Sequence, residues 1–166
     1  MISMEKYNSR TNEAYGDPYL LSLKPGELAV CKQCKSVYGG KRWELASQAA
    51  KDAVHTSKVV ETLCPACQKI RDHQPGGIVT ISGEFVKEHK EEILNLLHNE
   101  NYAAMRINPL GRVMDIEESG DHLVVQTTNE KVAQRIGRAL YKSWSGAVEY
   151  KWSKGTKFAR VNWRRD

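Results

Sequence analysis

Apolar positions recur with a helical period in the last third of the chain and with a strand period on either side of it. Over residues 128–144 they fall on one helix face, at Val132, Ala133, Ile136 and Leu140. Thr128 is the expected N-cap of this helix and Gly146 its C-cap. Alternating segments at 112–118 and 122–128 precede it, and others at 147–152 and 157–165 follow it. Short turns join the members of each pair, so the pattern predicts a ββαββ domain.

A second helical stripe lies upstream, after a short strand within residues 77–85. Its apolar positions are Val86, Ile93, Leu94 and Leu97, and charged residues fill the other side. Ser82 is the expected N-cap of this helix, which should run over 84–99. The turn Asn-Pro-Leu-Gly at 108–111 then marks the expected start of another unit.

The first half contains shorter elements. Residues 41–45 predict a strand, 47–56 a short helix, and 68–73 a helix that ends at Gln-Pro-Gly-Gly. Residues 1–26 are polar and turn-rich, which predicts an extended arm. The expected α+β organisation is therefore an arm at 1–26, a four-cysteine module at 27–76, a strand-helix connector at 77–108 and the ββαββ domain at 109–166.

The composition indicates the cellular compartment and the net charge of the protein. With 40% hydrophobic and 27% charged residues, the chain is an ordinary globular protein. No apolar stretch reaches the roughly 18 residues of a membrane span, and residues 1–17 lack the apolar core of a secretory signal. We therefore expect a cytoplasmic protein with reduced thiols and no membrane partner. The formal net charge is +5, which favours an anionic partner only where the charge is clustered.

The four cysteines form two CxxC pairs, Cys31 with Cys34 and Cys64 with Cys67. Four thiolates at this spacing complete the tetrahedral shell of a structural Zn²⁺ and leave no open position for water or substrate. Structural zinc contributes about 10 to 16 kcal/mol in small fingers, whereas a module of this size has little core of its own. The pattern therefore predicts structural zinc in a treble-clef or zinc-ribbon-like module.

Other chemistry has less support. A redox-active dithiol would need a helix after the first pair, but Gly39 and Gly40 break the chain there. His55 and His73 would become ligands only if a cysteine were displaced, so we expect them at the surface or beside the ligands. No catalytic triad, acid and base pair or phosphate-binding loop is evident. We therefore expect no enzymatic activity and no small-molecule substrate.

Positive charge is concentrated near the C-terminus. Between residues 131 and 165, ten Lys and Arg residues stand against one acidic residue, Glu149. The predicted nucleic-acid contacts in this segment are Arg135, Arg138, Lys142, Lys151, Lys154, Lys157, Arg160, Arg164 and Arg165. A second group surrounds the cysteines, with Lys32, Lys35, Lys41 and Arg42 near the first pair and Lys69 and Arg71 after the second. Zinc knuckles with basic flanks are typical of RNA-binding proteins, so RNA is the expected partner.

The alternation of the last strand separates two kinds of side chain. Arg160, Asn162 and Arg164 share one face, whereas Val161 and Trp163 share the other, so the arginines should lie opposite the packed helix. Two interpretations of the nearby aromatic residues remain open. Tyr150, Trp152 and Trp163 either stack on RNA bases or form part of the core.

Three stretches together resemble a family of small bacterial zinc proteins with two CxxC knuckles and mostly unassigned roles: CKQCKSVYGGKRW, CPACQKIRDHQPGGIVTISGEFVKEHKEEILNLLHNE and TTNEKVAQRIGRAL. The double CxxC followed by VMDIEESGDHLVVQTTNEKVAQRIGRAL also resembles the Nmd-three proteins, which bind the large ribosomal subunit in archaea and eukaryotes and act in its maturation and export. The resemblance implies a ribosome-associated factor with metal ligands at the four cysteines. An export role cannot apply to a bacterium, which has no nucleus.

Two functional hypotheses follow. The first is a non-enzymatic, zinc-stabilised factor that binds ribosomal RNA, with the large subunit favoured, in maturation, quality control or stress-induced hibernation. The second is a zinc module that binds another protein or acts in transcription. No recognition helix with base-reading residues is evident, which makes sequence-specific DNA binding the weaker alternative.

Overall fold

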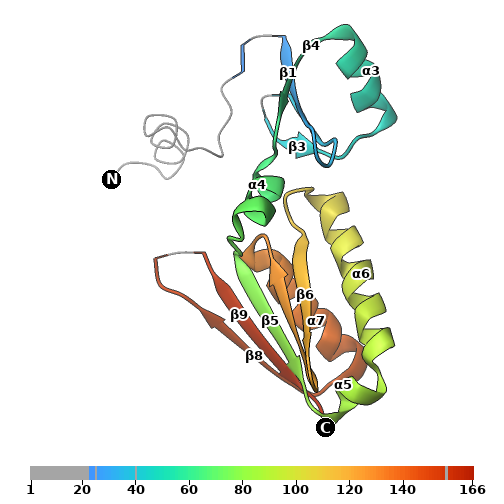
Figure 1. Cartoon of the computed structure of the whole chain (residues 1–166), viewed down its shortest axis with the longest axis vertical. Helices are drawn as coiled ribbons and strands as arrows, with labels where there is room; N and C mark the ends of the chain where they lie inside the picture. The colour runs from blue at the N-terminus through green and yellow to red at the C-terminus, as the bar shows by residue number, and fades with distance from the viewer. Residues whose placement is uncertain (1–22, 25, 40, 156) are drawn as a thin grey trace. The chain divides into compact units, whose positions relative to one another are not determined.

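The alternation of buried and exposed residues along the strands builds two separate sheets in the computed structural model of this protein (Figure 1). The structure describes residues 23, 24, 26–39, 41–155 and 157–166. The chain divides into two compact units, Met1–Gln68 and Lys69–Asp166, called unit 1 and unit 2 below. The described elements confirm the predicted α+β class, whereas the expected arm falls almost entirely outside the described residues.

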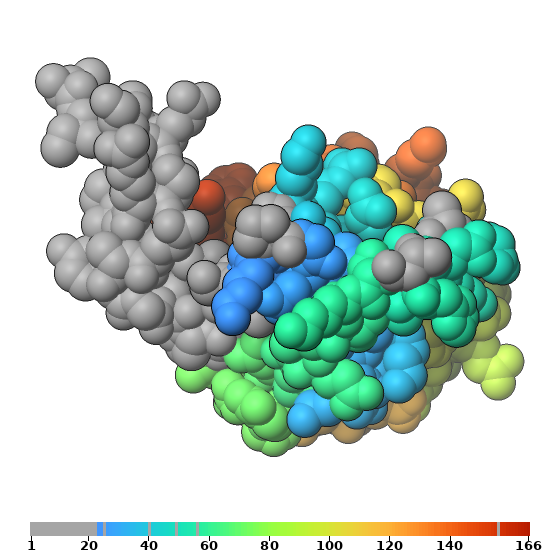
Figure 2. All heavy atoms as spheres, turned by 90° about the horizontal axis from the view of Figure 1, so that it is seen from above, coloured from blue at the N-terminus to red at the C-terminus, as the bar shows by residue number. Residues whose placement is uncertain are grey.

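Unit 1 contains a four-stranded sheet in the order β3-β2-β1-β4. Its strands are β1 (Glu27–Cys31), β2 (Val37–Tyr38), β3 (Trp43–Glu44) and β4 (Lys58–Thr62). Strands β1 and β4 run parallel and are paired over their full lengths, whereas β2 and β3 form short antiparallel pairs. Figure 2 shows atoms of β1, in blue, beside atoms of β4, in green.

The predicted short helix of unit 1 is present as α3 (Gln48–Thr56). Ser47 caps it, because its side-chain oxygen accepts a hydrogen bond from the Ala50 N–H at 3.1 Å. This helix connects β3 to β4, which supplies the long crossover that the parallel β1–β4 pair requires. Helix α4 (Pro65–Asp72) follows β4, as the sequence predicts, and carries the boundary between the units.

Unit 2 contains a five-stranded sheet in the order β6-β7-β5-β9-β8. Its strands are β5 (Gly77–Ser82), β6 (Val113–Ser119), β7 (His122–Thr127), β8 (Ala147–Trp152) and β9 (Ala159–Arg164). The two predicted hairpins are present as β6–β7 and β8–β9. Strand β5 lies between them, antiparallel to β7 and parallel to β9.

The central position of β5 corrects the predicted domain boundary. Residues 77–108 are not a connector to a separate ββαββ domain, because β5 joins the two hairpins into one sheet. Each hairpin has two strand edges, and β5 pairs with one edge of each, the β7 edge and the β9 edge. The ββαββ order of the sequence is therefore correct, but this fold is completed by a strand from outside it.

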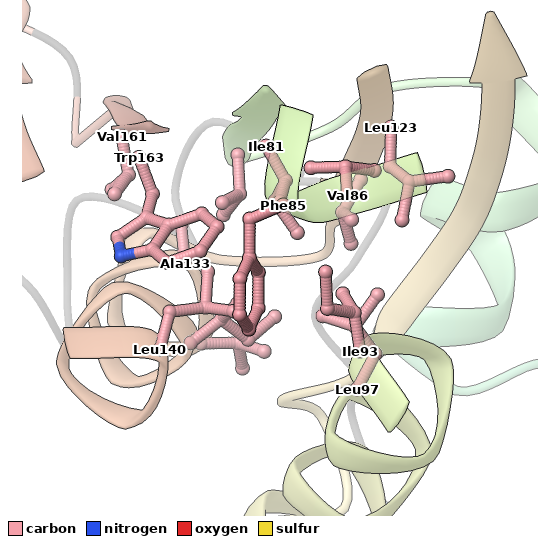
Figure 3. Packing of buried hydrophobic residues seen from close by; sticks show 14 of the residues in the cluster. Ile81, Phe85, Val86, Ile93, Leu97, Leu123, Ala133, Leu140, Val161 and Trp163 are labelled. Atoms are coloured by element: carbon pink, nitrogen blue, oxygen red, sulfur yellow. The ribbon is translucent and has the colours of Figure 1, made fainter. Parts of the chain in front are cut away.

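The helices of unit 2 pack against one face of this sheet. They are α5 (Glu84–Glu88), α6 (Lys90–Ile107) and α7 (Glu130–Trp144). Their apolar stripes meet the inward residues of the strands in one cluster, which includes Ile93, Leu97, Ile136, Leu140 and Val161. Figure 3 shows Phe85 of α5 among side chains from α6, α7 and β9. Trp163 lies in this cluster with its side chain fully buried, and its indole N–H donates a hydrogen bond to the Ser145 carbonyl at 2.7 Å.

Two predicted helix starts were wrong by one residue. Ser82 is the last residue of β5, and the chain turns at Gly83, whose φ of 108° lies in the region that favours glycine. The expected helix over 84–99 is divided at His89 into α5 and α6, and α6 continues to Ile107. Upstream of α7, Asn129 is the N-cap, because its Oδ1 accepts the Val132 N–H at 3.0 Å.

Thr128 does not cap the helix as predicted but is hydrogen-bonded to Arg112. It is buried, its backbone N–H donates to the Arg112 carbonyl at 2.9 Å, and its Oγ1 accepts the Arg112 N–H at 2.9 Å. These bonds attach the turn after α6 to the end of β7. Thr128 therefore extends the strand pairing, which leaves the next residue to begin the helix.

Candidate metal centre and basic surfaces

Paired strands bring the four cysteines of unit 1 together. Cys31 is the last residue of β1, and Cys64 follows the end of β4, its parallel neighbour. Because the carboxyl ends of parallel strands meet at one edge of a sheet, the two CxxC segments start side by side. Cys34 lies in the turn after β1, and Cys67 lies in the first turn of α4.

The sulfur atoms have the spacing of a metal site. All four Sγ atoms lie within 4.8 Å of one another, and Cys34 Sγ is 3.7 Å from Cys64 Sγ. A tetrahedral ion with metal–sulfur bonds of about 2.3 Å separates its sulfur ligands by about 3.8 Å. The cluster therefore needs little rearrangement to hold a metal ion.

Backbone amides surround these sulfurs. The Cys34 and Cys64 N–H groups lie 3.5 and 3.3 Å from Cys31 Sγ, and the Cys67 N–H lies 3.4 Å from Cys64 Sγ. Such donors stabilise negative charge on a thiolate and fix the ligand positions. Cys31, Cys64 and Cys67 are buried, whereas Cys34 is half-buried beside Ser36, with 3.2 Å between Sγ and Oγ.

Ser36 lies beside the cysteine cluster and was not predicted from the sequence. It is fully buried, and its carbonyl accepts the Cys31 N–H at 2.9 Å. Lys35, with φ of 66°, makes the tight turn that returns the chain to Cys31. A serine two positions after a CxxC has no distinctive spacing, so the sequence carries no signal for this contact.

The alternatives to a four-cysteine site can be compared with the described residues. The first CxxC is followed by β2 and not by the helix of a thioredoxin-like dithiol site. His55 and His73 are exposed, and neither belongs to the cluster found among the residues that the structure describes. The four cysteines together are therefore the candidate metal ligands.

The cations around the first CxxC form a group that we call the knuckle cations: Lys32, Lys35, Lys41 and Arg42. All four are exposed. Arg42 lies 3.5 Å from the Glu44 carboxylate, and Lys35 Nζ donates to the Lys32 carbonyl at 3.1 Å. Arg71, in unit 2, is also exposed and forms an ion pair with Asp72 at 2.8 Å.

Nine of the ten basic residues of 131–165 belong to two different surfaces of unit 2, and Arg165 belongs to neither. The hairpin surface contains the exposed cations of β8, β9 and their loop, which are Lys151, Lys154, Lys157, Arg160 and Arg164. The α7 stripe contains Lys131, Arg135, Arg138 and Lys142. The sequence predicts a single patch here, because proximity in the chain does not show which layer a residue faces.

The hairpin surface includes part of the open face of the sheet. Along β9, Ala159, Val161 and Trp163 are buried, whereas Arg160, Asn162 and Arg164 are exposed, as the alternation predicted. Lys151 is the cross-strand neighbour of Arg160. Two of these cations have acidic partners: Lys151 lies 3.4 Å from Glu149 and Arg164 lies 3.3 Å from Asp166.

Charge changes sign across this open face. One row of cross-strand neighbours runs from β6 to β8 through Asp115, Gln126, Ile78, Arg160 and Lys151. The β6–β7 turn adds Asp121, whose pKa is held below its usual range by a backbone hydrogen bond and by the His122 side chain. That carboxylate therefore stays charged at neutral pH. An anionic ligand would be attracted to the β8–β9 side and repelled from the β6 side.

The α7 stripe lies on the helix face opposite the packed one. Val132, Ala133, Ile136 and Leu140 are buried toward the sheet, whereas Lys131, Arg138 and Lys142 are exposed. Arg135 donates through Nε to Glu100 of α6 at 2.6 Å and is half-buried. No other ion pair joins the stripe to a residue in the described part of the chain.

Arg165 and two of the aromatic residues have intramolecular contacts. The Arg165 guanidinium lies 4.4 Å from the Phe85 ring centroid and donates to the Trp144 carbonyl at 2.8 Å. Trp163 is in the core and Tyr150 packs against it, which supports the core interpretation for both. Trp152 is 58% exposed and stacks on Tyr150 with 6.0 Å between ring centroids.

Comparisons with known proteins add no family to this description. No protein-family model matches the chain, and no curated protein matches it at the significance required. Among the described helices, none combines the length and the apolar character that crossing a membrane requires.

Proposed function

We propose that this protein is a non-enzymatic factor that is stabilised by zinc and binds ribosomal RNA, with the large subunit favoured. Zinc is the ion proposed because four cysteine sulfurs in a tetrahedral arrangement are its common structural shell. Cys31, Cys34, Cys64 and Cys67 would all be ligands, so the ion would have no position left for a substrate. Its role would be to hold β1, β4 and α4 together.

The observation that supports an RNA partner is the hairpin surface. Its five exposed cations stand against Glu149 and Asp166. They lie in the β8–β9 loop and on a sheet face that no helix of the described unit 2 covers. Counterion release makes such a cluster a binding site for a polyanion. Exposed Trp152 adds one aromatic ring at the same hairpin. The ribosomal target itself comes from the resemblance to the Nmd-three proteins.

Sedimentation of a host-cell extract tests the proposal. At low salt we expect the protein to migrate with the large ribosomal subunit. Each phosphate contact contributes about 0.7 to 0.9 to the slope of log affinity against log salt, so salt should release it steeply. The variant with Lys154→Gln, Lys157→Gln and Arg160→Gln should lower that slope by about 2 to 3.

A matched control has the same kind of charge change elsewhere. Lys51→Gln with Lys87→Gln removes two exposed cations from α3 and α5, which belong to neither basic surface. We expect this variant to migrate like the unmodified protein. If the unmodified protein stays at the top of the gradient at every salt concentration, ribosome binding is wrong. Capture of one defined protein without ribosomal RNA would support the protein-interaction alternative.

A further inference from the structure

The two basic surfaces of unit 2 lie on opposite layers. Lys151, Arg160 and Arg164 project from the open face of the sheet, because their strand neighbours Val161 and Trp163 are buried on the other face. The α7 stripe projects from the far side of the helix layer, because Ile136 and Leu140 face the sheet. Figure 1 shows α7 behind the strands of this sheet.

The separation is too large for one phosphate to be shared. A helix with its side chains is about 10 to 12 Å across, and the sheet adds further thickness. The Debye length at physiological ionic strength is about 8 Å. An RNA phosphate held in solvent at one surface therefore gains little from the cations of the other.

The α7 stripe is itself suited to follow a nucleic-acid backbone. Its four cations recur at i, i+4, i+7 and i+11, which places them in one row about 16 Å long. A hollow of about 550 Å³ adjoins the row and is lined by Arg135, Arg138, Lys142 and Glu100. Glu100 is the one acidic residue lining it, and it already pairs with Arg135. Arg138 and Lys142 are thus exposed to an anion along the row.

We propose that unit 2 bridges two RNA segments, one on the α7 stripe and the other on the hairpin surface. This inference rests on the proposed RNA partner but not on its being ribosomal. Each surface contacts phosphates and not base edges, so each segment is bound with little sequence preference. A factor of this kind holds two RNA elements at a fixed separation, which a single basic patch cannot do.

The stoichiometry of a defined complex tests the bridge. The full-length, zinc-loaded protein is labelled with a fluorophore and mixed with an excess of a short RNA hairpin that carries a second label. Sedimentation velocity then measures how many RNA molecules bind each protein molecule. We expect two hairpins per protein. Arg138→Gln with Lys142→Gln should reduce this to one, and Lys151→Gln with Arg160→Gln should do the same.

The knuckle cations require their own control, because unit 1 is a third possible RNA contact. The count is repeated with Lys32→Gln, Lys41→Gln and Arg42→Gln, and two hairpins should still bind. The Lys51→Gln with Lys87→Gln variant should also retain two. Circular dichroism checks folding, and Lys131→Gln with Lys142→Gln replaces the first stripe pair if that pair is misfolded.

The outcomes separate the two proposals. One hairpin per unmodified protein, or loss of the second hairpin in the knuckle variant, overturns the bridge. A single pair of substitutions that abolishes all binding also overturns it. Two hairpins bound by a protein that ignores ribosomes leaves the bridge intact and overturns the ribosomal target, whereas absence of any RNA binding overturns both.

Discussion

The interiors of unit 1 and unit 2 are built from different kinds of residue. Unit 1 has two strands of two residues each, and three of its buried apolar positions are the cysteines Cys31, Cys64 and Cys67. Unit 2 has a continuous cluster of buried side chains from β5, β7, β9 and three helices, with partly buried side chains from β6 and β8 packed against it, and all of its members lie between residues 79 and 163. Unit 1 therefore buries little apolar side chain beyond its cysteine cluster, whereas unit 2 is stabilised by a large buried apolar area.

Metal removal should give the largest difference in stability between unit 1 and unit 2. Cys64→Ser removes one ligand of the proposed zinc site, and a strong chelator removes the ion. Structural zinc contributes about 10 to 16 kcal/mol in small fingers. We expect backbone amides in β1 and β4 to lose protection from hydrogen exchange while those in β5 and β9 keep it. Lys32→Ser, an exposed change in the turn that contains Cys34, should retain the metal. Equal loss of protection in both units would show that they are not independent.

The complementary experiment removes a buried apolar side chain from unit 2. Ile136 is fully buried, so Ile136→Ala should lower the free energy of unfolding of unit 2 by about 2 to 5 kcal/mol. Metal content, measured on the same sample, should not change. Ser143→Ala on the exposed side of α7 should stay within about 0.5 kcal/mol of the unmodified protein. Loss of metal in Ile136→Ala would break the comparison.

The close approach of the Arg165 backbone to Gly83 can be tested by substitution within unit 2. Gly83 and Gly120 both have positive φ, but a Cβ at Gly83 would lie 1.9 Å from the Arg165 carbonyl oxygen, whereas Gly120 faces open space. Alanine at Gly120 incurs about 1 to 2 kcal/mol for the left-handed backbone. Alanine at Gly83, where ψ is 169°, would occupy a region that is essentially restricted to glycine and incurs about 1 to 3 kcal/mol. Gly83→Ala should lose about 1 to 3 kcal/mol more from overpacking. Urea unfolding of both variants measures this difference, and equal values would contradict the close contact.

The smallest expected effect concerns the start of α7. Asn129→Ala removes the side chain that accepts the Val132 N–H and should destabilise unit 2 by about 1 kcal/mol. Asn129→Ser should restore most of the loss, since serine caps almost as well. Thermal unfolding of unit 2 provides the measurement. If Asn129→Ala has no effect, the capping assigned to this residue is wrong.

Local pattern predicted most of the elements. The stripe at Val132, Ile136 and Leu140 placed α7, and the alternation of Arg160 and Val161 placed β9 with its faces in the right order. The paired CxxC spacing identified the four clustered cysteines. These features depend on neighbours within a few residues, so their physics is present in the sequence itself.

The boundary errors came from competition between neighbouring elements. Ser82 and Thr128 are good capping residues, but strand pairing with Arg164 and Arg112 kept them in β5 and at the end of β7. Gly83 and Asn129 then took the helix starts. Propensity alone cannot decide such cases, because the pairing partner is far away in the chain.

The sequence by itself determined the periodic elements, the ligand set and the excess of positive charge. The tertiary structure decided that β5 joins two hairpins, that Trp163 belongs to the core and Arg165 packs on Phe85, and that neighbouring cations in the chain point from opposite layers. The physical reason is that a sheet is assembled from partners distant in sequence. Which face a side chain presents to solvent depends on what packs against the other face.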